Sequence, residues 1–144
     1  MQALSAGLYT KLTAVQTAGT VYALTGGRIY DTLAPHETGT GNSRSAPAFP
    51  YLVFSVISDP ADRGFSYETQ RAAVEFEIIG DKRGGKATLG TINEALFDLL
   101  NGSSITIAGH DRGVVTCDDR GFSSVEEDAM VITSIYTVEA TEFN

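Results

Sequence analysis

The sequence has few of the residues on which most catalytic, disulfide-stabilised and membrane-spanning proteins depend. Its 144 residues include one cysteine, two histidines, four prolines and no tryptophan. The single cysteine, Cys117, excludes a disulfide within the chain and favours synthesis in a reducing cytosol. No apolar run approaches the roughly 20 residues that a membrane-spanning helix needs. The opening MQALSAGLYTKL lacks the basic start and the apolar core of a signal peptide, so we expect no secretory leader.

Basic residues are also scarce. Lys and Arg together number 10, against 18 Asp and Glu, which gives a net charge of -8. A nucleic-acid-binding surface needs clustered basic side chains. The closest cluster, Lys82, Arg83 and Lys86, is typical of a solvated turn before a helix. The acidic balance instead fits a surface past which DNA can slide without sticking.

The candidate nucleophile and the candidate general bases are separated along the chain. Cys117 precedes Asp118 and Asp119, whose charges would raise the pKa of the thiol, so it is better explained as a strand residue. His36 lies in a polar segment, and His110 lies in the turn AGHDRG. No G-x-S-x-G motif provides a serine nucleophile. The sequence therefore predicts no catalytic residue.

Three carboxylates, Asp111, Asp118 and Asp119, are the best candidates for a metal site. Carboxylate oxygens suit Mg²⁺ or Ca²⁺, but these spacings match no EF-hand loop. Asp111 follows His110 directly, as a carboxylate that orients a histidine base would. However, the side chains of adjacent residues in a tight turn usually point apart. We expect a polar turn here, and neither a metal nor a cofactor.

Hydrophobic periodicity predicts two helices. The first covers residues 2–17, and the second covers about 86–101, immediately before a glycine that can end a helix. The apolar stripe of the first helix consists of Leu4, Leu8, Leu12 and Val15. The stripe of the second consists of Leu89, Ile92, Leu96, Leu99 and Leu100.

Alternating and continuously apolar segments predict the strands. They fall at about 28–31, 49–57, 66–80, 104–109, 112–118 and 129–141. Runs of strands interrupted by separate helices favour an α+β fold. We predict an antiparallel sheet of about five strands with two helices packed on one face, in one domain spanning residues 1–144.

The strands differ in how much of them should be buried. Residues 66–80 alternate, with Ala72, Val74, Phe76 and Ile78 on one face, as a half-buried strand does. Residues 49–57 are almost continuously apolar, which predicts that both faces are covered. The face that the helices leave free carries Ala73, Ile79, Val131 and Ile135. We expect another copy of the chain to bury part of this face.

A long polar segment at about 34–48 separates the strands at 28–31 and 49–57. It contains no apolar residue between His36 and Ser45, so it can bury little and is expected to be a flexible loop. Loops of this length are usually functional or disordered. We expect the segment to become ordered by contact with another protein. The candidate contact residues are His36, Glu37, Thr38, Asn42 and Arg44.

Several segments, taken in order, resemble a known family. They are LYTKLTA, GGRIYDTLAP, FPYLVFSVIS, VEFEIIGD, EALFDLLNG, SITIAG and AMVITSIYTVEAT. In order and spacing they are similar to the tail-completion proteins of long-tailed bacteriophages, also called tail terminator or head–tail joining proteins. The resemblance covers nearly the whole chain, and its short motifs place Arg28, Tyr30, Pro50 and Tyr51 at motif positions. We interpret these four residues as maintaining the fold.

The resemblance implies a structural role in the virion. Members of this family form a ring, typically of six copies, at the head-proximal end of the tail tube. The ring stops polymerisation of the tube protein and offers a docking surface to the head–tail connector, and DNA passes through its lumen without specific binding. The chain would then be made in the host cytoplasm and reside in the neck of the virion, with no membrane partner.

Two alternatives remain open from the residues alone. One is a stopper or adaptor protein in the neck. Such a protein also acts by non-covalent assembly, but it does not sit at the end of the tail tube. The other is a small α+β enzyme or ligand-binding domain, with His36 or His110 as base and the polar segment as a lid. The poverty of clustered catalytic groups argues against the second alternative.

Deleting residues 37–45 should leave the melting temperature of the protein within a few degrees of the wild-type value, because the segment has nothing apolar to bury. Thermal unfolding followed by circular dichroism measures this directly. A large drop would mean that the segment belongs to the core.

Overall fold

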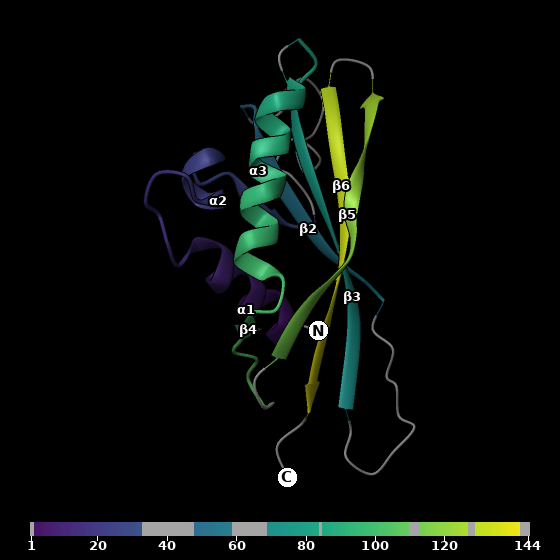
Figure 1. Ribbon diagram of the computed structural model, residues 1–144. Coiled ribbons are helices and arrows are strands. Elements are labelled where there is room, and N and C mark those ends of the chain that lie inside the picture. The colour runs from purple at the N-terminus through teal and green to yellow at the C-terminus, as the bar shows by residue number, and fades with distance from the viewer. Residues whose placement is uncertain are drawn as a thin grey trace, which may run out of the picture.

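The computed structural model describes residues 2–32, 48–58, 69–83, 85–109, 113–126 and 129–141. The elements, in chain order, are α1 (Gln2–Thr13), α2 (Val21–Leu24), β1 (Ile29–Asp31), β2 (Tyr51–Ser58), β3 (Thr69–Asp81), α3 (Gly85–Leu100), β4 (Ser104–Ile105), β5 (Gly113–Glu126) and β6 (Ala129–Thr141). Figure 1 shows the helices on one side of a strongly twisted sheet, with α3 lying along the long strands. The α+β class is therefore as predicted.

The sheet differs from the prediction in number and in direction of strands. Its order is β1-β2-β3-β6-β5-β4, which makes six strands rather than about five. The sheet is mixed and not antiparallel throughout, because β1 pairs parallel to β2, with Ile29 opposite Leu52. A parallel pair needs a crossover of a dozen or more residues, and the long segment between Asp31 and Tyr51 provides one.

The first part of the chain corrects the predicted helix boundaries. α1 ends at Thr13 and not at residue 17, and the Gln16 side chain donates a hydrogen bond to the Thr13 carbonyl at 3.2 Å. Val15 lies beyond the helix and is 49% exposed, so it does not extend the apolar stripe. A third helix, α2, was not predicted because four residues are too few to show a period. It begins after Thr20, whose hydroxyl accepts a hydrogen bond from the Ala23 N–H at 3.3 Å.

The strands after α3 also differ from their predicted bounds. β4 is limited to Ser104–Ile105, and β5 continues to Glu126 instead of ending near residue 118. β5 passes two register shifts against β6, one between Cys117 and Asp119 and one between Asp119 and Phe122. Such bulges accommodate the polar sequence CDDRG within the strand. From the sequence alone, these residues indicated that the strand ends there.

The main core lies between the helices and the sheet. Leu4, Leu8 and Leu12 of α1 are at most 1% exposed, as the periodicity predicted. The four core leucines and isoleucines of α3 are fully buried: Leu89, Ile92, Leu96 and Leu100. They meet a row of aromatic rings on the central strands, in which Phe76 packs edge-on against Tyr136 at 5.2 Å between centroids. Burying each such side chain stabilises the fold by about 1.5–3 kcal/mol.

The predicted alternation of β3 is confirmed. Ala72, Val74, Phe76 and Ile78 are all buried in the main core. Gly80 continues this face at the end of the strand, where an added Cβ would come within 2.6 Å of Leu89 Cδ2. The absence of a side chain there lets the first turns of α3 approach the sheet closely.

Two helical glycines have opposite surroundings. A Cβ on Gly7 in α1 would overlap the Thr106 carbonyl oxygen, whereas a Cβ on Gly90 in α3 would meet nothing within 4 Å. We therefore expect Gly7→Ala to lower the free energy of unfolding by about 1–3 kcal/mol through overpacking. Gly90→Ala should raise it by about 0.5–1 kcal/mol, because alanine restricts the unfolded chain and favours helix. Urea denaturation of the two variants checks this pair, and equal effects would contradict the close packing of α1 on residue 106.

Candidate interaction surfaces

The four motif residues lie together where the chain enters β2. Arg28, just before β1, donates from Nε to the Pro50 carbonyl at 3.1 Å and from Nη2 to the Phe49 carbonyl at 3.3 Å. These bonds hold the entry to β2 against the beginning of β1. The Phe49–Pro50 peptide bond is cis. A charged donor shared between two carbonyls contributes more than a neutral hydrogen bond does.

The aromatic members of this cluster stack on the helix-free side of the sheet. The Tyr51 ring lies parallel to that of Phe49, with centroids 6.1 Å apart, and edge-on to that of Tyr30 at 6.0 Å. Tyr51 is 6% exposed, whereas Phe49 is 39% exposed. Phe49 therefore presents an aromatic surface to solvent beside the buried Tyr51 and the half-buried Tyr30. The sequence pointed to Arg28, Tyr30 and the residues of β2, but not to Phe49.

Tyr51 begins an apolar row across the helix-free face. It pairs with Ile79, which pairs with Val131, and these two side chains are 9% and 4% exposed. Both are therefore already buried within the single chain. Of the four residues predicted on this face, only Ala73 and Ile135 are half-buried, so they limit the apolar area that this part of the face offers to another molecule. The prediction that both faces of residues 49–57 are covered holds at Tyr51 and fails at Ile57, which is 49% exposed.

The predicted contact residues of the long polar segment cannot be placed. His36, Glu37, Thr38, Asn42 and Arg44 lie outside the described residues. His110 and Asp111 also lie outside the described residues. His110 was a candidate base, and Asp111 was one of the three candidate metal ligands.

The described part of the chain offers little catalytic chemistry. Cys117 lies in β5, as predicted for a strand residue. Burial raises the pKa of its thiol, and Asp118 and Asp119 raise it further, while Tyr136 and Arg120 lower it. Burial, with the neighbouring Cys117, also raises the pKa of Tyr136. A thiol held protonated is a poor nucleophile. Within the described ranges no group of three or more His, Cys, Asp or Glu residues is placed to hold a metal ion.

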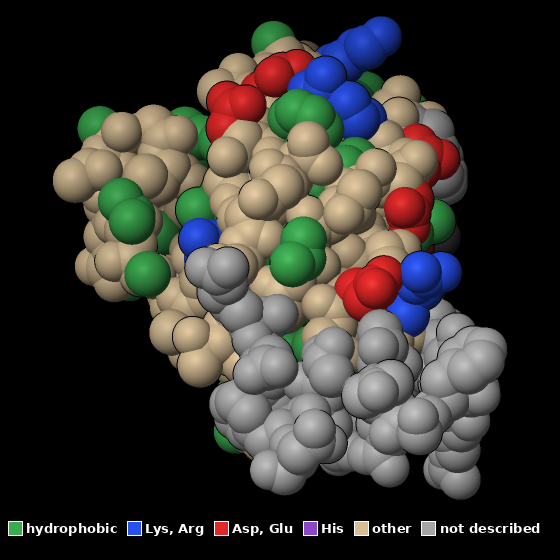
Figure 2. All heavy atoms as spheres, turned by 60° about the horizontal axis from the view of Figure 1, so that its bottom comes forward, with side chains coloured by type: hydrophobic (Ala, Val, Ile, Leu, Met, Phe, Trp, Pro, Cys, Tyr) green, Lys and Arg blue, Asp and Glu red, His purple; other side chains and the backbone are tan. Residues whose placement is uncertain are grey.

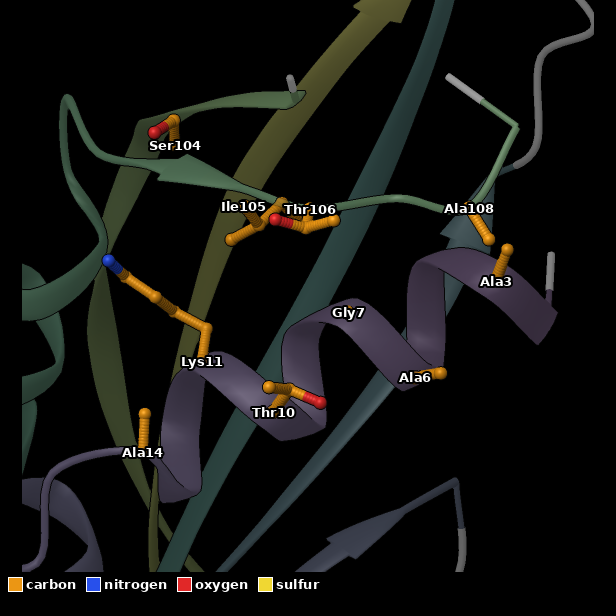
Figure 3. A pocket seen from close by; sticks show the side chains of 10 residues that line it. All are labelled: Ala3, Ala6, Gly7, Thr10, Lys11, Ala14, Ser104, Ile105, Thr106 and Ala108. Atoms are coloured by element: carbon orange, nitrogen blue, oxygen red, sulfur yellow. The ribbon is translucent and has the colours of Figure 1, made fainter. Parts of the chain in front are cut away.

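One open pocket of about 430 Å³ lies between α1 and the segment at 104–108 (Figure 3). Small side chains form most of its wall, and Lys11 is the one charged residue that lines it. Gly7 lies opposite Thr106, where a Cβ added to Gly7 would overlap the Thr106 carbonyl oxygen. Among the described lining residues there is no carboxylate, imidazole or thiol, so this part of the wall supplies no group suited to general acid–base or nucleophilic catalysis.

Acidic and basic side chains are interspersed on the face that Figure 2 shows. In Figure 2 acidic and basic side chains lie next to one another in small groups rather than in a patch of one sign. Two exposed ion pairs join separate elements, Arg71 with Glu139 at 3.0 Å and Arg120 with Glu94 at 2.7 Å. No helix in the described ranges is long and apolar enough to cross a membrane. The view gives no sign of the basic stripe that nucleic-acid binding requires.

Comparison with known proteins identifies similar folds but no family. No protein-family model matches the chain, and no curated protein matches it. A chain in the solved structure of the virion of a native gene transfer agent particle superposes with a TM-score of 0.69 and is 22% identical, over 97% of this chain and 96% of that one. A second solved structure superposes with a TM-score of 0.64 and is 13% identical, over 99% of this chain and 96% of the other. At these identities the likeness shows a shared fold.

Replacing Arg28 by Met should lower the free energy of unfolding by about 1.5–3 kcal/mol, because two carbonyls lose a charged donor in a partly buried site. Arg71→Met is the matched control. Its guanidinium pairs with Glu139 on the exposed surface, so its loss should have an effect below about 1 kcal/mol. Urea denaturation of both variants measures the difference. Equal losses would mean that the bonds from Arg28 do not fasten β1 to β2.

Proposed function

We propose that the protein is a structural component of a virion that forms a ring at the head-proximal end of a phage tail tube. In this role the ring, of six copies, stops polymerisation of the tube protein and joins the tail to the head–tail connector. DNA passes through its lumen. The protein acts by non-covalent assembly, without turnover, metal or cofactor.

The observation that carries the proposal is the extent of the fold likeness. Almost the whole of this chain superposes on almost the whole of a chain from a virion. The succession of family-like segments in the sequence points to the same class of protein and adds the more specific position at the end of the tail tube.

The chemistry of the described residues agrees with an assembly role. The described lining of the pocket at α1 has no acid–base group, the thiol of Cys117 is held protonated, and acidic and basic side chains are interspersed on the face shown in Figure 2. A net charge of -8 keeps single copies soluble and disfavours a grip on DNA. We infer that residues 36–45 serve as a contact segment for a neighbouring virion protein.

A stopper or adaptor in the neck is the second candidate function. It shares the fold likeness to a virion component, and it would also sit where DNA passes between head and tail. The two candidates differ in their partner, because only a terminator acts on the growing end of the tail tube.

Purified protein should form ring-shaped oligomers, at least at high concentration. Static light scattering as a function of concentration, together with negative-stain images, measures the mass and shape. Compact monomers at every concentration would overturn the ring.

Added to polymerising tube protein, the purified chain should shorten the tubes in proportion to its concentration and appear at one end only. The lengths in electron micrographs measure this effect. Unchanged lengths, with binding to the connector alone, would favour the stopper or adaptor instead.

A further inference from the structure

At one edge of the sheet, β5 has a neighbouring strand over only part of its length in the described chain. β4 covers β5 only at its beginning, where Ser104 pairs with Val114 and Ile105 with Gly113. Farther along β5, the described part of the chain places no strand on that side. We call residues 123–125 the open edge. Its three residues are all exposed, and Val125 reaches 55% exposure.

The main-chain groups of alternate residues in an edge strand point away from the sheet. On β5, Val115 donates to the Ser103 carbonyl and accepts from the Gly102 N–H, so its groups point away from β6. Cys117 has the same phase, because its N–H donates to Asn101 Oδ1 at 3.0 Å. The two register shifts that follow each add one residue to β5. Two added residues restore the phase, so Ser123 and Val125 also point their N–H and C=O groups outward.

The bulged part of β5 is protected and the open edge is not. Asn93 of α3 donates to the Arg120 carbonyl at 2.6 Å. The Arg120 guanidinium lies 4.0 Å from the centre of the Phe97 ring and bonds Glu94. These contacts cover the bulge with side chains from α3. Unprotected edges are templates for pairing with another strand.

The opposite edge of the sheet is β1, and it also has outward-pointing groups. Leu52 donates to the Arg28 carbonyl at 2.9 Å, and Thr32 donates to the Phe54 carbonyl at 2.7 Å. Arg28 and Thr32 therefore turn these groups toward β2. By alternation, the carbonyl of Ile29 and the main-chain groups of Asp31 turn away from the sheet.

The two edges correspond in their position along the strands and in strand direction. One row of paired residues runs from β1 to β5 through Ile29, Leu52, Ile78, Ile132 and Ser123. Ser123, the first residue of the open edge, therefore lies level with Ile29, the first residue of β1. β1 runs with β2 and against β3, whereas β5 runs with β3, so two copies in the same orientation would bring β5 and β1 together antiparallel. Antiparallel pairing is the more stable of the two arrangements.

We propose that the open edge of one copy pairs with β1 of the next copy, so that a continuous sheet joins the subunits. The contact is heterologous, with one edge of each copy meeting the other edge of its neighbour, as a closed ring requires. This inference rests on the proposed ring and names the surfaces that form it.

Cross-linking tests the contact directly. In a Cys117→Ser background, Ser123→Cys and Asp31→Cys together should give a ladder of covalent oligomers beyond the dimer with a short bifunctional maleimide. Each substitution alone should give monomers. The matched control replaces Ser123→Cys with Thr116→Cys, an exposed position on the same strand outside the open edge, and should give no ladder.

The outcomes separate this contact from the ring itself. Rings by light scattering without a ladder would overturn the edge contact and leave the proposed function standing. The absence of any oligomer would overturn both. Dimers from Ser123→Cys alone would show that two open edges pair with each other, which contradicts the head-to-tail arrangement.

Ser123→Pro provides a second test without cross-linking, because Ser123 lies level with Ile29, whose carbonyl turns outward. Proline removes an outward N–H that the β5–β6 ladder does not use, so the melting temperature should stay within a few degrees. The concentration at half-assembly should rise about fivefold to tenfold, as expected for a lost intermolecular hydrogen bond and a disturbed strand edge. Unchanged assembly of this folded variant would overturn the proposal.

Discussion

The fold depends on the long antiparallel pairing of β3 with β6. These strands stay in register without a shift, from Thr69 opposite Thr141 to Asp81 opposite Ala129. Every other element is positioned by this pair, since β2 and β1 extend the sheet from β3, and β5 and β4 extend it from β6. α3 connects β3 to the second half of the sheet and packs its leucines across the same two strands. A slip by one residue would turn Phe76 and Tyr136 out of the core.

The same pairing determines where the sheet can meet another molecule. Because the helices cover one face and the row from Tyr51 to Val131 is buried on the other, the described residues leave little apolar area on the faces apart from the exposed Phe49 and Ile57. The two edges are the further surfaces that the described part of the chain offers. One is short and starts at the cluster around Arg28, and the other is long and interrupted by bulges. Assembly through edges needs main-chain hydrogen bonds rather than a large apolar patch, which is consistent with an acidic chain of ordinary hydrophobicity.

The sequence predicted best those elements whose side chains repeat with one period. α3, β3 and β6 were located within a few residues, because their apolar positions recur at 3.6 or at 2. The direction of β1 could not be predicted, since three residues carry no information about their partner. The length of β5 was missed because bulges break the alternation that reveals a strand. The Arg28 cluster was located through family-like motifs, whereas the open edge depends on register, which single-sequence patterns do not contain.

An open strand edge has to remain soluble before assembly and pair during it. In this chain the protected bulge and the net charge of -8 oppose random edge-to-edge association, because like-charged copies repel one another and α3 covers the middle of β5. Only a few residues near the hairpin end stay available, so a single contact is short and weak. A closed ring changes this balance, since each copy then makes two contacts and the last contact forms within one assembly at high effective concentration. Short, directional and unprotected edges thus favour a closed ring over an irregular aggregate.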